Sequence, residues 1–178
     1  MKKKILIVVD VQNDFVDGAL GTKEAQAMLP SLVEKIKGFD GEIIFTQDTH
    51  TPDYANTQEG KLLPVAHCIE GTDGWEVAKA VKDAAKGKTV RCYKKPIFGS
   101  IALLNDLMSE YEKGEIESIE LVGICTDICV VSNALMLKSG LSEVPIYVDA
   151  LCCAGVSPKK HKAALEVMKS CQIRVTGE

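Results

Sequence analysis

Short, continuous apolar runs alternate with amphipathic stretches along nearly the whole chain, and this alternation constrains the fold most. The first run, residues 5–10, is unbroken until the aspartate that ends it. Runs without internal polar residues are typical of strands buried on both faces, as in parallel sheets that helices cover on each side. We therefore predict an α/β fold, a three-layer αβα sandwich around a mostly parallel, Rossmann-like sheet of about six strands.

The boundaries of the elements follow from the same periodicity. In residues 23–39, Met28, Leu32 and Ile36 recur at helical spacing and mark a buried helix face. Ser157 followed by proline is typical of a helix start. The other predicted helices are 75–85, 100–113 and 127–139, and the other predicted strands are 42–47, 89–93, 118–123, 145–149 and 172–175.

The bulk composition excludes several classes of function. The 178 residues carry a formal net charge of -4 with a pI of about 5.5, so no basic face for nucleic acid is implied. No apolar run approaches the ~20 residues that a membrane helix needs. The opening lysines and apolar run imitate a signal peptide, but Asp10, Asn13 and Asp14 interrupt the run and no cleavage site follows. We expect a single cytoplasmic domain, residues 1–178.

The seven cysteines are odd in number and show no compact disulfide spacing. In a reducing compartment, most of them should be buried thiols that behave as small hydrophobic side chains. The surroundings of each cysteine therefore decide whether its thiol is reactive.

Cys129 stands where a predicted strand leads into a predicted helix, at the end of the segment 121–129. Backbone N–H groups and the helix dipole favour an anion at such a position, so we expect a lowered thiol pKa and a reactive thiolate. The alternative is a thiol packed in the core at a helix start. The position alone leaves both interpretations open.

Polar residues end two further predicted strands. In parallel α/β sheets, ligands bind beyond the carboxyl ends of the strands. Asp10 ends the first strand, and Lys94 and Lys95 follow the third. Each has a plainer alternative, because Asp10 could cap a loop and the lysines could form a solvated pair. Reactive groups on three strand ends together favour a catalytic site that joins Cys129, Asp10 and one lysine.

A second constellation has the residue types of a metal site. Asp48 and His50 lie two residues apart after a strand, so in an extended segment they project to the same side. With His67 they offer one carboxylate and two imidazoles, a set that suits zinc, iron or manganese. Loop residues that hydrogen-bond the backbone are the alternative. Cys68 could be a fourth ligand, although its side chain would point away in an extended segment. His161 is expected on a solvated helix face.

Four short motifs gather these residues. They read Asp-x-Gln-Asn-Asp-Phe at 10–15, Thr-Gln-Asp-x-His at 46–50, His-Cys-x-x-Gly-Thr-x-Gly at 67–74 and Gly-x-x-Thr-Asp-x-Cys at 123–129. Together they resemble the isochorismatase-like cysteine hydrolases, and within that family the nicotinamidase/pyrazinamidase branch. The resemblance covers nearly the whole chain and implies the isochorismatase-like hydrolase fold.

The resemblance implies catalytic roles for residues of the first and last motifs. Asp10 would be the general base, Cys129 the nucleophile and Lys95 the catalytic lysine, with Lys94 as the alternative. The backbone N–H groups of Cys125 and Cys129 would form the oxyanion hole. The resemblance also implies a cis peptide bond directly before Cys125.

The same resemblance implies a metal-dependent reaction on a small amide. One divalent ion, zinc first and iron or manganese as alternatives, would be held by Asp48, His50 and His67, and Phe15 would line the substrate pocket. The implied reaction is deamidation of nicotinamide to nicotinate and ammonia through a thioester on Cys129, with pyrazinamide also accepted. We expect a homo-oligomer whose partner is a small amide, rather than nucleic acid or a membrane.

Several positions depart from the nicotinamidase pattern. No tryptophan occurs in residues 62–66, where one usually lines the ring pocket, and the loop 51–57 lacks the third metal histidine of some relatives. A Phe-Gly pair precedes Ser100, whereas the family has a phenylalanine after the corresponding serine. Trp75 follows the metal motifs and is expected to pack its own helix.

These departures keep other functions open. A hydrolase of the same family could act on another small amide, a carbamoyl compound or a vinyl ether. A non-catalytic redox protein that uses Cys125 and Cys129 is an alternative of another class, although a disulfide between residues four apart at a helix start is sterically unfavourable.

Overall fold

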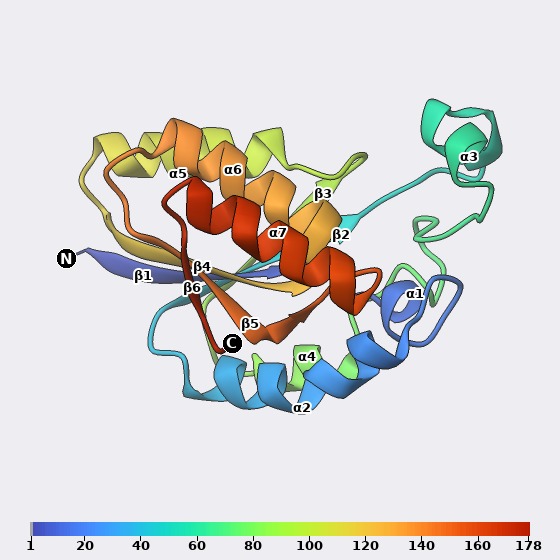
Figure 1. Ribbon diagram of the computed structural model, residues 1–178, viewed down its shortest axis with the longest axis horizontal. Helices are drawn as coiled ribbons and strands as arrows, with labels where there is room; N and C mark the ends of the chain where they lie inside the picture. Colours follow the sequence, from blue (N-terminus) through green and yellow to red (C-terminus); the bar gives the residue numbers. More distant parts are fainter. Residues whose placement is uncertain (1) are drawn as a thin grey trace.

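A six-stranded sheet forms the centre of the computed structural model, which describes residues 2–178 (Figure 1). The strand order is β3-β2-β1-β4-β5-β6, and all neighbouring strands are parallel. The strands are β1 Lys3–Val9, β2 Glu42–Asp48, β3 Val90–Lys95, β4 Ile116–Ile124, β5 Ile146–Ala154 and β6 Arg174–Thr176. The predicted α/β fold with about six strands is confirmed.

Helices cover both faces of the sheet, which gives three layers (Figure 1). Helices α2 and α4 lie on one face, and α5, α6 and α7 lie on the other. These helices are α2 Lys23–Gly38, α4 Lys79–Ala84, α5 Ile101–Glu112, α6 Val131–Gly140 and α7 Pro158–Ser170. Shorter pieces are α1 Asn13–Val16, a 3-10 turn Tyr54–Asn56 and α3 Gln58–Leu62. Within residues 2–178, no helix has the length and apolar character needed to cross a membrane.

The centre of the sheet is buried on both faces, as the continuous apolar runs predict. Ile5 to Val9 of β1 are at most 1% exposed, and each such side chain contributes roughly 1.5–3 kcal/mol on burial. Serine and threonine side chains cap the starts of three of the covering helices, α2, α5 and α7. Thr22 accepts a hydrogen bond from the Ala25 N–H at 3.0 Å, and Ser100 caps α5 in the same way.

The order of the strands determines where a ligand can bind. Chain connections run from β1 outward to β2 and β3, and then return to β4 on the other side of β1. The neighbouring connections after β1 and β4 therefore lead to opposite sides, which opens a crevice beyond the carboxyl ends of the strands. The residues that follow Val9 and Ile124 lie at that crevice.

The region after residue 74 differs from the predicted helix 75–85, because α4 begins only at Lys79. Residues 75–78 are tied to the segment after β1 instead. The Trp75 carbonyl accepts hydrogen bonds from the Gln12 and Gln47 side chains at 2.8 and 3.1 Å, and the Ala78 N–H donates to Val11 at 2.9 Å. These tertiary bonds satisfy backbone groups that a helix would otherwise use.

Two more boundaries differ from the sequence prediction. The strand predicted at 145–149 continues to Ala154, with a register irregularity between Leu121 and Gly123 of its partner β4. The helix predicted at 127–139 begins with a π-helical turn, Thr126–Val130, before α6. A single π-helical turn inside a helix is frequent at functional sites.

Candidate active site

Four strand ends bring four reactive side chains to one crevice. Asp10 directly follows β1, and Asp48 and Lys95 are the last residues of β2 and β3. Cys129 lies in the π-helical turn after β4. The predicted placement of Asp10, a lysine and Cys129 at the carboxyl edge of the sheet therefore matches the structure.

Lys95 is the centre of this group. Its side chain is only 1% exposed, and its Nζ lies 2.6 Å from Asp10 Oδ2. The same Nζ lies 3.6 Å from Cys129 Sγ and 3.5 Å from Asp48 Oδ1. Lys94 instead points outward, where its Nζ pairs with Glu70 at 2.6 Å. Of the two lysines that the sequence left open, only Lys95 contacts both Asp10 and Cys129.

The Asp10 carboxylate is fixed by its neighbour in β2. The Thr46 hydroxyl donates to Asp10 Oδ1 at 2.6 Å, and the Asp10 N–H lies 3.2 Å from both the Thr46 carbonyl and its hydroxyl oxygen. The Asp10 backbone has a φ of 49°, in the left-handed region that non-glycine residues seldom adopt. Hydrogen bonds on both sides of Asp10 maintain this conformation and aim the carboxylate at Lys95.

The protonation of the group differs from the sequence expectation. Burial raises the pKa of Cys129 well above its usual range, the charge of Asp10 raises it further, and the Lys95 charge only partly opposes this. Burial also raises the pKa of Asp10, against the effect of Lys95. The prediction of a lowered thiol pKa was wrong, because burial outweighs the helix dipole at this position. Cys129 is a neutral thiol beside a carboxylate that can accept its proton.

Helix α7 contacts the segment that directly precedes Cys129. The Ile124–Cys125 peptide bond is cis, as the family resemblance implied. Thr126 is fully buried, and its hydroxyl lies 2.8 Å from Nδ1 of His161. The prediction of a solvated His161 was wrong, because α7 packs against the π-helical turn Thr126–Val130 that carries Cys129, which we call the nucleophile turn.

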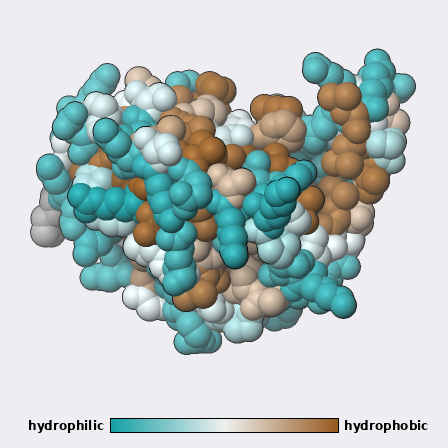
Figure 2. All heavy atoms as spheres, in the orientation of Figure 1, coloured by the Kyte–Doolittle hydropathy of each residue, from teal (hydrophilic) through white to brown (hydrophobic). Residues whose placement is uncertain are grey.

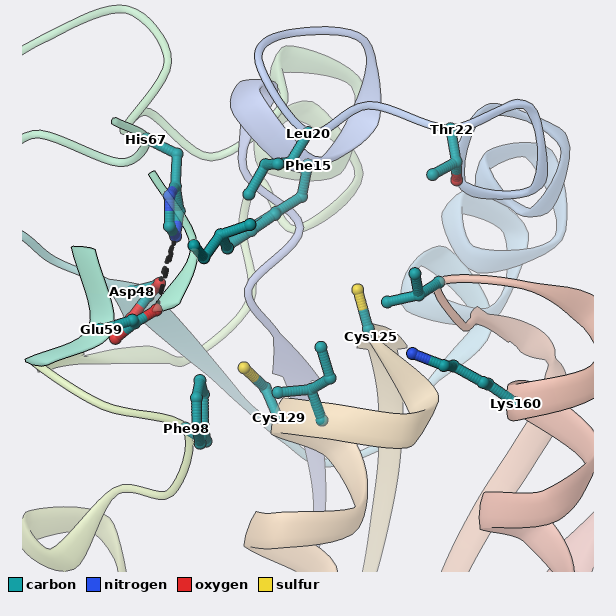
Figure 3. A pocket seen from close by; sticks show the side chains of 13 residues that line it. Phe15, Leu20, Thr22, Asp48, Glu59, His67, Phe98, Cys125, Cys129 and Lys160 are labelled. Carbon is teal, nitrogen blue, oxygen red and sulfur yellow. Dashed lines mark ion pairs between the residues drawn. The ribbon is translucent and has the colours of Figure 1, made fainter. Parts of the chain in front are cut away.

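A second cluster lies beside the first and shares Asp48 with it. The nitrogen atoms of His50 and His67 lie 3.1 and 3.5 Å from Asp48 Oδ2 and 3.8 Å from Glu59 Oε1. One ligand atom from each of these four residues lies within 4.8 Å of the others. The His67 Nδ1 contacts the Val65 carbonyl at 2.8 Å, which leaves Nε2 facing the carboxylates (Figure 3).

These donor atoms fit a divalent metal ion. Two imidazole nitrogens and two carboxylate oxygens converge, three of the four residues are buried, and a second hydrogen bond orients the His67 ring. Cys68, which the sequence allowed as a fourth ligand, does not belong to the cluster and is buried in the hydrophobic core. The structure thus brings together the three predicted ligands Asp48, His50 and His67.

Glu59 is the member of the cluster that the sequence analysis missed. It belongs to α3, which follows the loop where a third histidine was sought and not found. The available signal was an acidic residue between the two histidines. That signal is weak, because acidic side chains are common on exposed helices.

The remaining polar residues of the first motif support both clusters. The Gln12 side chain donates to the Asp48 carbonyl and accepts from the Asp48 N–H, both at 2.8 Å. Asp14 accepts a hydrogen bond from the Cys68 N–H at 2.7 Å. The motif at 10–15 therefore supplies one reactive carboxylate and two side chains that hold the metal cluster in place.

A cavity of about 300 Å³ lies over both clusters (Figure 3). Phe15 and Phe98 provide aromatic side chains, and Leu63 stands in the segment where the family tryptophan is missing. Trp75 lies elsewhere: its indole N–H donates to Thr49 at 2.9 Å, so the prediction that it packs its own helix was wrong. The residues that line the cavity are Phe15, Leu20, Thr22, Asp48, Glu59, Leu63, His67, Phe98, Cys125, Ile128, Cys129, Val156 and Lys160.

Comparison with known proteins identifies the family. Residues 4–178 match the Isochorismatase domain. The chain belongs to the isochorismatase family. The predicted class, a hydrolase of this family, is therefore confirmed.

Relatives in the isochorismatase family cover almost the whole chain. The nicotinamidase/pyrazinamidase of Mycobacterium tuberculosis is 28% identical over 193 residues, which is 97% of each chain. The crystal structure of a Bacillus subtilis nicotinamidase/pyrazinamidase has a TM-score of 0.84 and 28% identity, and it covers 99% of this chain and 100% of its own. A Pyrococcus horikoshii pyrazinamidase, solved in complex with zinc, has a TM-score of 0.80, 25% identity and 99% coverage of each chain.

Proposed function

We propose that this protein is a metal-dependent cysteine amidohydrolase that converts nicotinamide to nicotinate and ammonia through a thioester. One observation carries the proposal: the Lys95 Nζ lies within 3.6 Å of the Asp10 carboxylate, the Cys129 thiol and the Asp48 carboxylate. A single buried cation thus joins a base, a nucleophile and the candidate metal cluster. The nicotinamidases among the relatives support the choice of substrate.

The reaction begins with a proton transfer within the buried group. Asp10 takes the proton of Cys129 when the amide is bound, and the charge of Lys95 stabilises the thiolate that forms. The raised pKa of Cys129 keeps the thiol protonated until then. The raised pKa of Asp10 makes its carboxylate a stronger base than an exposed aspartate.

The thiolate attacks the amide carbon, and the backbone of the nucleophile turn receives the negative charge. The N–H groups of Cys125 and Cys129 act as the oxyanion hole, and each such donor contributes about 3 kcal/mol. Asp10 returns the proton to the leaving nitrogen, and ammonia departs. Water then attacks the thioester while Asp10 takes the water proton. The C–S bond breaks, Asp10 returns that proton to the Cys129 sulfur, and the product leaves as nicotinate after its acid proton passes to solvent.

Asp48, His50, Glu59 and His67 would hold the metal, with zinc as the first choice and iron or manganese as alternatives. A bound divalent ion would supply a Lewis acid that can hold the ring nitrogen of the substrate and lower the pKa of water. Phe15 lies beside this cluster, with its ring centroid 5.4 Å from that of His67, and it packs on the substrate ring.

Ammonia release from nicotinamide, pyrazinamide and aliphatic amides tests the proposal. The wild-type protein, loaded with zinc, should release ammonia from the two aromatic amides, and Cys129→Ala should abolish this release while its circular dichroism spectrum is unchanged. Cys171→Ala, which removes an exposed thiol, is the matched control and should keep full activity. Turnover by Cys129→Ala would contradict the mechanism.

The aliphatic residues that line the cavity support a second class of substrate. Leu63 and Leu20 line the cavity, and the tryptophan expected before His67 is absent. An aliphatic wall suits a small aliphatic amide or carbamoyl compound better than a tryptophan would. Faster release from the aliphatic amides than from nicotinamide would favour this class.

The proposed enzyme is one cytoplasmic domain, residues 1–178, that assembles as a homo-oligomer. All seven cysteines are free, which supports a reducing compartment. Leu62, Ile97 and Ile101 are exposed by 79%, 45% and 61%, and exposed apolar side chains of this kind support an interface between copies. Light scattering of the purified protein tests the assembly, and a monomer mass would contradict it.

A further inference from the structure

The cavity has two chemically different walls. Asp48, Glu59 and His67 form the wall that carries the candidate metal cluster. Lys160 projects into the cavity from the opposite side, from the first turn of α7, and its ammonium group points toward the space beside Cys125 (Figure 3). A ligand that reaches across the cavity therefore meets metal ligands at one end and a cation at the other.

The first turn of α7 is unusually rich in cations for a helix start. It contains Lys159 and Lys160, with Lys162 following, and it has no acidic residue. The amino end of a helix carries partial positive charge, so acidic side chains are stabilising there and lysines are not. The residues thus add to the positive potential of this wall at some cost in helix stability.

Lys160 also lacks a counterion in the protein. Among residues 2–178, no carboxylate lies within ion-pair distance of its Nζ. Lys169, at the other end of α7, differs, because it pairs with Glu166 and Glu178 at 2.8 and 2.7 Å. Asp127 and Lys160 line the same neighbouring surface pocket, but the Asp127 Oδ1 accepts a hydrogen bond from the Val156 N–H at 2.9 Å and forms no ion pair with Lys160.

Lys160 is exposed to solvent but lines the cavity, and its charge affects a thiol that lines the same cavity. Burial raises the pKa of the Cys125 thiol to about 12, Asp127 and Asp10 raise it as well, and Lys160 opposes the rise. Cys125 precedes the nucleophile turn, so the field of Lys160 reaches the region where the amide must bind. An anionic group on a ligand in that region would gain a partner that the free protein leaves open.

We propose that Lys160 forms an anion subsite, and that the preferred substrates are small amides that carry a carboxylate on the side away from the metal cluster. This inference rests on the proposed function for the amide, whereas the preference for an anion depends on Lys160 alone. The subsite is a specificity determinant: it contributes to binding and takes no part in the proton transfers.

The test compares two ligands that differ by one carboxylate, nicotinamide and the monoamide of dinicotinic acid. Dissociation constants are measured by calorimetry on zinc-loaded full-length protein that carries Cys129→Ala, so that neither ligand is consumed. We expect the carboxylated amide to bind more tightly than nicotinamide. Lys160→Gln should reduce this preference about fivefold, the size expected of one partly exposed ion pair.

Lys159→Gln is the matched control, because Lys159 lies in the same turn and does not line the cavity. It should change the preference less than about twofold, the size of a screened surface charge. Raising the salt concentration should reduce the preference in the parent protein and leave it unchanged in Lys160→Gln. A salt-independent preference, or equal effects of the two substitutions, would overturn the subsite.

The outcomes also separate this inference from the proposed function. Ammonia release from nicotinamide by the unsubstituted enzyme tests the function, and the ratio of dissociation constants tests the subsite. A ratio that depends on Lys160 without nicotinamide turnover would leave the subsite standing and reject the substrate. Turnover of nicotinamide by an enzyme that does not bind the carboxylated amide would reject the subsite alone.

Discussion

Two regions of the molecule build the cavity, and they are constructed differently. Its floor consists of strand ends, where Asp10, Lys95 and Cys129 are at most 5% exposed. Its outer wall comes from residues 51–66, which we call the arm. The arm extends away from the sheet and carries α3 at its tip (Figure 1). Figure 2 shows hydrophobic side chains along the arm beside hydrophilic ones, and Leu62 is 79% exposed there.

The contacts of the two regions differ in the same way. In the floor, an ion pair of 2.6 Å joins Lys95, at the end of β3, to Asp10, directly after β1, and the parallel strand β2 lies between these two strands. Tyr54 joins the arm to the metal-cluster histidines, because its ring centroid lies 4.7 Å from that of His50 and 5.1 Å from that of His67. Its hydroxyl donates to the Leu63 carbonyl at 2.9 Å, a hydrogen bond within the arm itself. The floor thus carries the buried candidate catalytic side chains, whereas the arm contributes Glu59 to the candidate metal cluster.

Replacing Lys95 by methionine should have the largest effect on activity and stability, because Lys95 contacts both Asp10 and Cys129 in the floor. The buried Asp10 carboxylate would lose its partner, which costs about 3–5 kcal/mol of folding stability, and the thiolate would lose its stabilising charge. We expect the rate of ammonia release per folded molecule to fall about a hundredfold to ten-thousandfold. Assays of ammonia release measure the loss of rate, and urea unfolding titrations measure the loss of folding stability.

Lys94→Met is the control for this change. Lys94 is the adjacent residue in β3, but its ammonium is exposed and pairs with Glu70. Activity should stay within about twofold, since exposed ion pairs contribute little. Equal losses of ammonia release in Lys95→Met and Lys94→Met would mean that the activity does not depend on the buried Lys95.

Two glycines, one in each region, test whether the floor and the arm differ in rigidity. A Cβ on Gly123 would lie 2.2 Å from the Val9 carbonyl oxygen, and a Cβ on Gly60 would lie 2.1 Å from that of Tyr54. Gly123 also has a φ of 118°. Gly123→Ala should lower the free energy of unfolding by about 3 kcal/mol or more, because the contact between β1 and β4 must open.

Gly60→Ala creates a similar clash, but the arm can adjust without disturbing the sheet. We expect the global free energy of unfolding to change by less than about 1 kcal/mol, while amide hydrogens of the arm exchange faster. Gly114→Ala, with a φ of 71° and no atom within 4 Å, gives the cost of the backbone conformation alone, about 1–2 kcal/mol. If Gly60→Ala and Gly123→Ala lowered the global free energy of unfolding equally, the floor and the arm would not differ in rigidity.

The same distinction explains how much the sequence could predict. The floor is built from strand ends, and unbroken apolar runs reveal where strands end. Asp10 and Cys129 could therefore be placed at one edge of the sheet from the sequence, together with one of two lysines. The family resemblance favoured Lys95 over Lys94, but the strand pattern alone did not separate them, since the difference depends on which face of β3 each residue occupies. The raised pKa of Cys129 also needed it, because burial depends on the whole fold.

The arm was less predictable for a physical reason. Its elements are short, and short helices such as α3 form through tertiary contacts rather than through their own periodicity. Glu59 and the 3-10 turn at Tyr54 were missed for this reason, whereas Asp48 and His67 were found through their motifs. His161 was misplaced because three neighbouring lysines suggested solvent, while its ring packs on Thr126.

Glu59→Gln tests whether the arm completes the metal site. The substitution keeps the shape of the side chain and removes one negative charge from the cluster. We expect zinc affinity to fall about ten- to a hundredfold, as when an interaction that supports a metal site is lost. Competition with a chromophoric chelator measures it. Glu70→Gln, a similar change at an exposed ion pair, should leave the affinity unchanged, and equal affinity in both variants would exclude Glu59 from the site.

The smallest expected effect concerns His161, which links α7 to the floor. Burial lowers the pKa of His161 below the ordinary histidine value, the charge of Lys162 lowers it as well, and the charges of Asp127 and Glu178 do not reverse this. The unfolded chain therefore binds a proton more readily than the folded protein does. This residue contributes stability that is complete at a pH well above 6.5 and is lost as the pH falls through the lower folded pKa.

His161→Gln removes this titration while an amide can still hydrogen-bond the Thr126 hydroxyl. The free energy of unfolding of the variant should then fall less between pH 7.5 and pH 5.5 than that of the wild type, a range of about one unit on either side of the ordinary histidine pKa. The other two histidines, in the metal cluster, are present in both proteins, so their titration cancels in the difference. Parallel pH dependences would mean that His161 is as solvated in solution as its neighbouring lysines, and that α7 does not hold the nucleophile turn.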